Sequence, residues 1–189
     1  MTNDEAKKTR EIARRWWTAL QPARERGYRG DPGALARLRR ASLIDAMTEP
    51  VTVRLHRELG LTRQTFSRAA LVACVLAHVR EDEPRLTVAR AAGPRSSGET
   101  GVLSALRFRR LLNIRGEEDC LISFRRLVTL LGGKLKVADL AETLLDWNDE
   151  AKGDRCRTRW AFDYYDAGWA APDGEPDLIQ DAEVEIKAT

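Results

Sequence analysis

Arginine is the residue type whose number and spacing most suggest a chemical role in this chain of 189 residues. Three short segments each carry three arginines within five residues or fewer. The nine side chains are those of Arg37, Arg39, Arg40, Arg107, Arg109, Arg110, Arg155, Arg157 and Arg159. A guanidinium group is charged at every physiological pH and can donate two parallel hydrogen bonds to one phosphate. We therefore interpret these arginines as a nucleic-acid-binding set that contacts phosphates without reading bases.

The middle segment is the most strongly basic, with four arginines in nine residues. At about 100° per residue, Ala105, Phe108 and Leu112 form an apolar stripe. Arg107 and Arg110 lie on roughly the opposite side of the same helix. This pattern predicts a helix that packs on one face and presents positive charge on another. An ordinary charged surface is the alternative interpretation, although alternating glutamate and lysine would serve solubility as well.

The net charge of +3 conceals an uneven distribution. Residues 170–189 carry six acidic side chains and one lysine, a net charge of −5, which leaves +8 for the rest of the chain. A basic folded body favours a polyanionic partner, most often nucleic acid, because bound phosphates release condensed counterions. The acidic tail contains two prolines and a glycine, so we expect it to be disordered and able to fold back over the basic surface.

The composition predicts an all-α protein, because leucine, alanine and arginine dominate and period-two alternation is hard to find. We expect two small helical bundles: an N-terminal lobe over 1–92, a loop over 93–101, a C-terminal lobe over 102–169 and a disordered acidic tail over 170–189. No segment reaches the roughly eighteen apolar residues of a membrane span, and the N-terminus lacks a signal-peptide core. We therefore expect a soluble, cytoplasmic protein with no membrane partner.

Local signals mark the helices that position the arginines. Asp31 followed by Pro32 predicts the start of the helix that carries the first group. The apolar run 69–77 predicts a helix at the centre of a bundle. In the third group the arginines run into aromatic residues, and we interpret Trp160 and Phe162 as buried at the end of a bundle.

Other conspicuous residues are better explained by structure than by chemistry. The pair Trp16 and Trp17 has core spacing, so burial is preferred over base stacking. The acidic run 81–84 is interpreted as a helix end, since adjacent acids point to different sides of a helix. His56 and His78 fall on different predicted helices, and the three cysteines lie far apart. We therefore expect a protein that is not an enzyme, with no catalytic set, no metal site and no cofactor.

Several segments occur in the same order as in a known family, over about residues 12–166. They are Trp16-Trp17, Gly30-Asp31, Leu35–Ala41, Leu106–Leu112, Gly132-Gly133, Val137–Ala141, Leu144–Trp147 and Arg159–Tyr165. Together they resemble CasB, the small subunit of the type I-E CRISPR surveillance complex Cascade. The resemblance implies an all-helical, non-catalytic protein of two small bundles, present as two copies in a larger antiviral ribonucleoprotein.

The resemblance also implies a set of partners. They are single-stranded or R-loop DNA, the guide RNA backbone, the other Cascade subunits and a second copy of the chain. There the basic surface would stabilise the R-loop and the displaced DNA strand, and modest contacts would suffice because strand exchange is nearly balanced energetically. Two alternatives stay open: a helix-turn-helix regulator with residues 31–41 as recognition helix, and a scaffold whose arginines bind acidic proteins.

Overall fold

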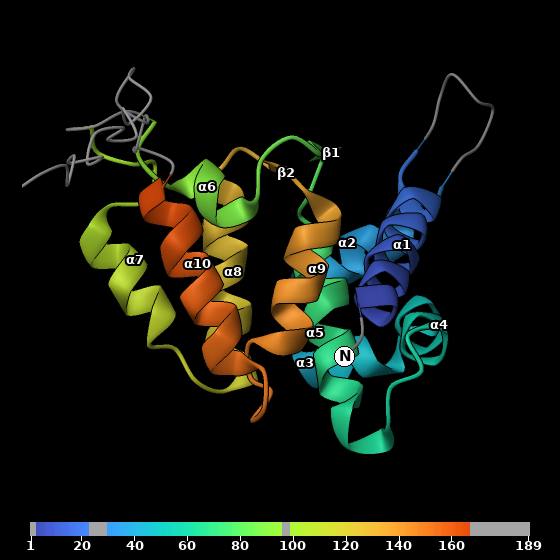
Figure 1. Ribbon diagram of the computed structural model, residues 1–189. Helices are drawn as coiled ribbons and strands as arrows, with labels where there is room; N and C mark the ends of the chain where they lie inside the picture. Colours follow the sequence, from blue (N-terminus) through green and yellow to red (C-terminus); the bar gives the residue numbers. More distant parts are fainter. Residues whose placement is uncertain (1–2, 23–29, 96–98, 167–189) are drawn as a thin grey trace, which may run out of the picture.

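The computed structural model describes residues 3–22, 30–95 and 99–166. This part of the chain is mostly helical (Figure 1), which confirms the predicted all-α class. Its helices are α1 (Asn3–Leu20), α2 (Pro32–Arg40), α3 (Leu43–Thr48), α4 (Pro50–Glu58), α5 (Phe66–Leu76), α6 (Val88–Ala92), α7 (Ala105–Leu112), α8 (Glu117–Leu130), α9 (Val137–Asp146) and α10 (Gly153–Asp166), with a 3₁₀ turn at Arg63–Thr65.

The described residues also contain two short strands, β1 (Glu81–Asp82) and β2 (Lys134–Leu135), which pair in parallel. None of the described helices is long and apolar enough to cross a membrane. The acidic tail expected over residues 170–189 lies outside the described part of the chain. What the sequence predicts for that tail stays a prediction.

Capping residues fix the starts of α2, which the sequence predicted, and of α3. The Asp31 carboxylate accepts a hydrogen bond from the backbone N–H of Ala34 at 2.8 Å, and Pro32 is the first residue of α2. Ser42 and Asp45 form a reciprocal capping box at the start of α3. Both arrangements satisfy backbone donors that the first turn of a helix leaves unpaired.

Helix α5 lies at the centre of the molecule, as its apolar sequence predicted. Every residue from Ala69 to Ala77 is fully buried, and α3, α4, α8 and α9 pack around it. Trp16 and Trp17 of α1 are buried too, and their indole N–H groups donate to the carbonyl oxygens of Val51 and Val79 at 2.8 and 3.3 Å. The two tryptophans therefore belong to the core, as predicted.

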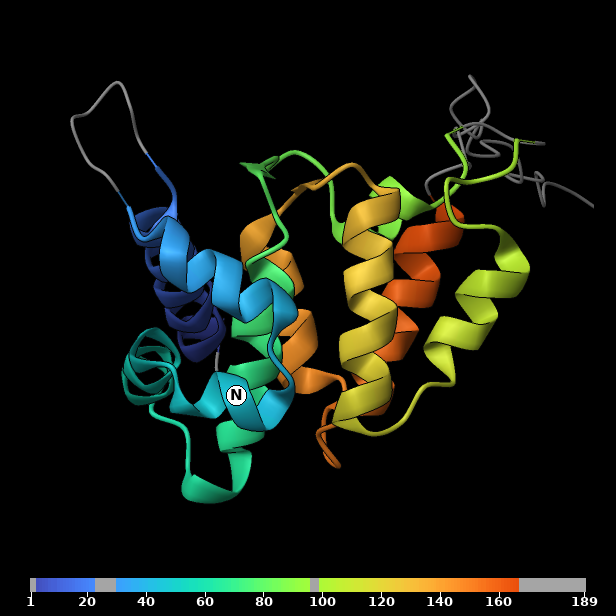
Figure 2. The same ribbon diagram turned by 180° about the vertical axis from the view of Figure 1, so that it is seen from behind.

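Helices α1, α2 and α4 lie on one side of α5, and α6, α7, α8 and α10 lie on the other, while α3 packs across α5 (Figures 1 and 2). Helix α9, from the second predicted lobe, packs against α1 from the first, and α6 packs against α10. One cluster of buried apolar residues runs through both halves. The division of the chain at 93–101 stays a prediction, with helices from the two sides in contact.

Strand β1 occupies the acidic segment that the sequence assigned to a helix end, so that prediction was wrong. Helix α5 already ends at Leu76, and the chain then extends to pair with β2. The Asp82 carboxylate accepts hydrogen bonds from the backbone N–H of Val137 at 3.0 Å and from Nε of Arg14 at 2.6 Å. This side chain therefore satisfies a backbone donor at the start of α9 and links α9 to α1.

Helix α10 buries only one of the two aromatic residues that the sequence assigned to the core. Trp160 is 1% exposed, as predicted, but Phe162 is 68% exposed, so its predicted burial is wrong. Two residues correspond to about 200° around a helix, so the two side chains point to opposite sides. The buried side of α10 carries Cys156, Trp160 and Tyr164, and Phe162 lies on the uncovered side.

Candidate nucleic-acid interface

A groove between α7 and α8 gathers three arginine side chains. Its volume is about 430 Å³, and its lining includes Arg107 and Arg110 from α7 and Arg126 from α8. The buried side chains of Leu111 and Leu127 also line it. No acidic residue of the described chain takes part in the lining. We call this feature the α7–α8 groove.

The amphipathic character of α7 explains why its arginines face outward. Phe108 and Leu111 are buried, whereas all three arginines of this helix are exposed. The Phe108 ring stacks on Tyr164 of α10 with 3.8 Å between ring centres, which anchors the helix. The chain then turns at Gly116, whose φ of 82° lies in the left-handed region that favours glycine. The predicted outward face of arginines is confirmed, but of the predicted packed stripe only Phe108 is buried, since Ala105 and Leu112 are half-buried and Leu111 is buried instead.

The groove has an uncompensated positive charge. Within the described part of the chain, the guanidinium groups of Arg107, Arg110 and Arg126 form no ion pair and no hydrogen bond. Three guanidinium groups that share one concave surface create a positive potential that attracts anions. The apolar side chains beneath them exclude some water, which strengthens the attraction.

A second groove of about 420 Å³, between α1, α5 and α9, has a different character. It is lined by four carboxylates and three basic side chains, among them Glu58, Glu142, Lys8 and Arg68. Because charges of both signs lie close together there, they compensate one another. The α7–α8 groove is therefore the stronger candidate for an anionic ligand.

The arginines of α2 have partners within the protein. Arg37 donates through Nε and Nη2 to the Glu49 carboxylate at 2.7 and 3.1 Å, and this hydrogen-bonded pair raises the pKa of Arg37 above its usual value. Arg39 donates through Nε to the carbonyl oxygen of Ala77 at 2.7 Å. Arg40 is exposed and has no ion pair with a described residue. Arg40 is thus the one arginine of this group whose side chain has no partner among the described residues.

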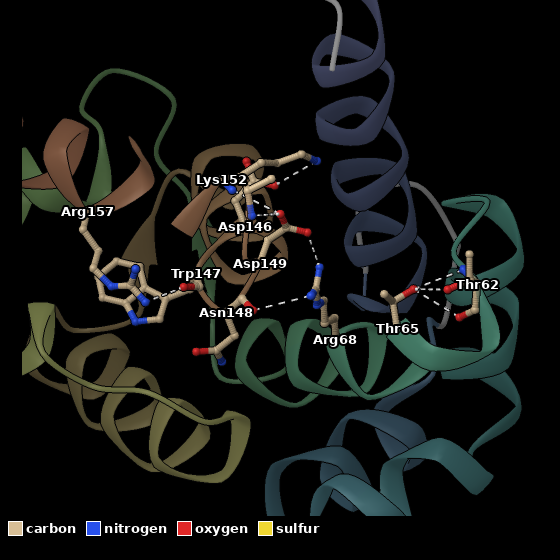
Figure 3. Close-up of polar contacts among 10 residues, drawn as sticks. Thr62, Thr65, Arg68, Asp146, Trp147, Asn148, Asp149, Lys152 and Arg157 are labelled. Atoms are coloured by element: carbon tan, nitrogen blue, oxygen red, sulfur yellow. Dashed lines mark hydrogen bonds and ion pairs between the residues drawn. The ribbon is translucent and has the colours of Figure 1, made fainter. Parts of the chain in front are cut away.

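Arg157 of α10 is turned toward the connection between α9 and α10 (Figure 3). Its Nη2 donates to the carbonyl oxygen of Trp147 at 2.7 Å, and its Nη1 donates to the Asp154 carboxylate at 3.0 Å. The guanidinium carbon lies 5.4 Å from the centre of the Trp147 ring. With its side chain only 11% exposed, Arg157 holds α10 against the end of α9.

Arg159 is held by side chains of α9. Its Nη1 lies 3.5 Å from Glu142, and its Nη2 lies 3.9 Å from Asp139 and donates to Thr143 at 3.2 Å. Burial alone would lower the pKa of Arg159, but the nearby carboxylates raise it overall. Arg155, in contrast, is exposed and forms no ion pair with the described residues.

The nine arginines singled out by the sequence thus fall into two groups. Four have partners in the protein, namely Arg37, Arg39, Arg157 and Arg159. Five are exposed and free of ion pairs within the described residues, namely Arg40, Arg107, Arg109, Arg110 and Arg155. The structure brings two of these five together in the α7–α8 groove, and phosphate contact by any of the nine stays a prediction.

Sequence reasoning missed the third arginine of the groove. Arg126 lies about 200° from the buried Phe124 around α8, so helical periodicity could have predicted that its side chain faces outward. Its neighbour Arg125 instead donates through Nη2 to the carbonyl oxygens of Leu38 and Ala41 at 3.0 and 2.8 Å. One member of this arginine pair therefore ties α8 to the end of α2, and the other faces the groove.

The connection between α9 and α10 is tied to α5 through Arg68 (Figure 3). Arg68 Nη1 donates to the Asp149 carboxylate at 2.6 Å, and its Nη2 contacts the carbonyl oxygen of Asn148 at 3.5 Å. The same carboxylate accepts from the backbone N–H groups of Ala151 and Lys152. Burial would raise the pKa of Asp149, but these hydrogen bonds and the charge of Arg68 lower it overall.

Replacing Arg68 with alanine is expected to destabilise the fold by about 1–2 kcal/mol, because a partly buried carboxylate loses its charged partner. Since the pKa of Asp149 is lowered in the folded state, this stabilisation is present above the pKa of an unfolded aspartate and is lost as pH falls through the folded-state pKa. Urea unfolding near neutral pH and below about pH 3 measures both effects. Arg63→Ala, an exposed site in the 3₁₀ turn, is the matched control; a difference that does not shrink at low pH would contradict the assignment.

The three cysteines are not reactive thiolates. Burial raises the pKa of Cys74, Cys120 and Cys156 to about 11, so each thiol is protonated at neutral pH. Within residues 3–22, 30–95 and 99–166, no group of three or more His, Cys, Asp or Glu side chains could hold a metal ion.

The chain matches the model of a known protein family. The family model described as CRISPR-associated protein Cse2 matches residues 34–165, a range that begins within α2, ends within α10 and includes both helices of the groove. The search of curated proteins and the search of solved structures gave no match.

Proposed function

This chain belongs to the CRISPR-associated Cse2 family, and we propose that it binds the phosphate backbone of nucleic acid through the α7–α8 groove. Members of this family are non-catalytic subunits of the type I-E CRISPR complex Cascade. The binding is independent of base sequence. Within the complex it stabilises the R-loop by holding the displaced DNA strand away from its complement.

The observation that carries this proposal is the convergence of three guanidinium groups on one groove without a described carboxylate. Arg107, Arg110 and Arg126 present planar donor groups that match the oxygens of a phosphate. Phosphates repeat along every strand whatever its bases, so contacts to them carry no sequence information. The groove therefore suits a subunit that must accept any target.

The energetics of an R-loop make a groove of this size sufficient. The guide–target heteroduplex is about as stable as the DNA duplex that it replaces, so small contributions decide the equilibrium. Three charge-assisted contacts at about 1 kcal/mol each would shift it by roughly 100-fold or more. No catalytic group is needed for this effect.

Family membership supports protein partners as well. We propose the other Cascade subunits and a second copy of the chain as those partners, and the guide RNA backbone as a second ligand, because DNA and RNA share the phosphate groups that the groove would contact. A helix-turn-helix role for α2 is less well supported, since Arg37 is held by Glu49 and Arg39 by the carbonyl oxygen of Ala77, just after α5. A scaffold whose arginines bind only acidic proteins would not bind nucleic acid. A nucleic-acid binding assay therefore distinguishes this alternative from the proposal.

The purified full-length chain is expected to bind unrelated single-stranded DNA sequences with affinities within about threefold of one another. If three phosphates are neutralised, a fourfold rise in salt should weaken the binding of single strands roughly 20-fold. Fluorescence anisotropy with DNA, duplex and RNA probes across a salt series measures both. Absence of binding at low salt, or an affinity that does not depend on salt, would contradict the proposal and favour a scaffold.

A further inference from the structure

The outward face of α10 carries aromatic side chains that the core does not use. Phe162 is 68% exposed and Tyr165 is 52% exposed. Together with Arg155 and Thr158 they follow the spacing i, i+3, i+7 and i+10, so all four lie on one stripe of the helix. We call these four residues the α10 stripe.

The Tyr165 ring is held in place by its neighbours. It meets the rings of Phe108 and Tyr164 nearly at right angles, with 6.0 and 5.0 Å between ring centres. Phe108 stacks on Tyr164, and the Tyr164 hydroxyl donates to the carbonyl oxygen of Leu103 at 2.6 Å. A half-exposed ring fixed in this way loses little conformational entropy when a ligand stacks on it.

The stripe carries one arginine, and a second exposed arginine lies on the adjacent helix α7, while the half-buried Asp163 follows Phe162 in the sequence. Arg155 within it and Arg109 on the neighbouring α7 are exposed, and neither forms an ion pair with a described residue. Asp154, next to Arg155 in the sequence, is paired with Arg157. Flat apolar rings flanked by guanidinium groups match a ligand that combines flat apolar faces with anionic groups.

We propose that Phe162 and Tyr165 stack on unpaired bases of single-stranded nucleic acid, while Arg155 and Arg109 contact the adjoining phosphates. This inference rests on the proposed function and narrows its ligand to a single strand. In a duplex each base is covered by its neighbours, whereas an unpaired base has a free face that any aromatic ring can cover.

The position of α7 connects the stripe to the α7–α8 groove. Helix α7 lies at one end of the molecule, and both α10 and α8 lie on its inner side, with α10 in front in Figure 1 and α8 in front in Figure 2. A strand whose backbone occupies the groove beside α8 would pass around α7 to place its next bases on the stripe. In this arrangement the α7–α8 groove contacts phosphates and the α10 stripe contacts bases.

The test compares three probes of equal length: a single-stranded DNA, the same sequence as a duplex, and an abasic strand that has phosphates but no bases. Phe162→Leu keeps the apolar character of the side chain and removes the ring. It is expected to weaken single-strand binding about tenfold and to leave duplex and abasic binding unchanged. Phe162→Trp should restore single-strand binding, and Ile44→Ala, which removes an exposed apolar side chain from α3, should have no effect.

A base analogue whose fluorescence changes on stacking, placed in the single strand, gives an independent signal. It should change on binding to the wild type and far less with Phe162→Leu. Equal binding of the single strand by wild type and Phe162→Leu would overturn the stacking inference and assign the stripe to a protein partner. If single-strand binding depends on Phe162 but the abasic strand does not bind at all, the inference stands and the phosphate groove of the proposed function fails.

Discussion

Replacing Arg107 and Arg110 together with alanine is expected to weaken the binding of single-stranded DNA about 30-fold at low salt. Both side chains line the α7–α8 groove, and neither has a carboxylate partner among the described residues. Their loss therefore removes two phosphate contacts without leaving a buried charge behind. At about 1 kcal/mol for each contact, the two together correspond to roughly 30-fold in the dissociation constant.

The matched control is Arg57→Ala together with Arg63→Ala. It removes the same net charge from exposed sites in α4 and in the 3₁₀ turn before α5, on the far side of α5 from the groove (Figure 1). We expect the control to change the affinity less than about threefold, because distant exposed charges are screened by salt. Equal losses in the two double variants would mean that net charge, and not the groove, determines binding.

Replacing Trp160 with alanine is expected to produce the largest loss of stability, about 3–5 kcal/mol. The indole is 1% exposed and packs against the rings of Phe124 and Trp147 at 5.6 and 5.3 Å. Its N–H donates to the Thr143 hydroxyl at 2.9 Å, so the substitution also leaves a buried hydroxyl without this donor. Against a typical total stability of about 5–15 kcal/mol, the variant should be close to unfolding at 37 °C.

Phe162→Ala, two residues away on the same helix, is the control for this prediction. Its ring is 68% exposed, so its loss should change stability by less than about 0.5 kcal/mol. Urea unfolding followed by circular dichroism measures both variants. Similar losses for Trp160→Ala and Phe162→Ala would contradict the packing described for α10.

The parts of the fold that the sequence predicted are those decided by neighbouring residues. Asp31 and Pro32 specify the start of α2 within one turn, and the apolar run 69–77 could only be buried. Strand β1 was not predictable in this way, because the hydrogen bond from the Val137 N–H to Asp82 joins residues 55 positions apart. A two-residue strand also leaves no periodic signal in the sequence.

The candidate site shows the same limit at the level of single arginines. Spacing predicted that Arg107 and Arg110 face outward, and they do. It could not distinguish them from Arg159, whose partners lie on α9, or from Arg39, whose acceptor lies 38 positions away at Ala77. An arginine is free for a ligand only if the tertiary structure offers it no partner, and that depends on long-range packing.

Phe162 illustrates the converse case. Aromatic residues in a helix are usually buried, but its position about 200° from Trp160 places it on the uncovered side of α10. Helical periodicity applied to the third arginine group, rather than its aromatic content, would have predicted this exposure.

The dependence of affinity on salt, compared between the wild type and the Arg107→Ala/Arg110→Ala variant, tests the central claim most directly. Each phosphate contact on a single strand contributes about 0.7 to the slope of log affinity against log salt concentration. If both arginines contact phosphates, the slope of the variant should be shallower by about 1.4, while the Arg57→Ala/Arg63→Ala control keeps the wild-type slope. An unchanged slope in the groove variant would show that these arginines do not contact phosphate and would contradict the account.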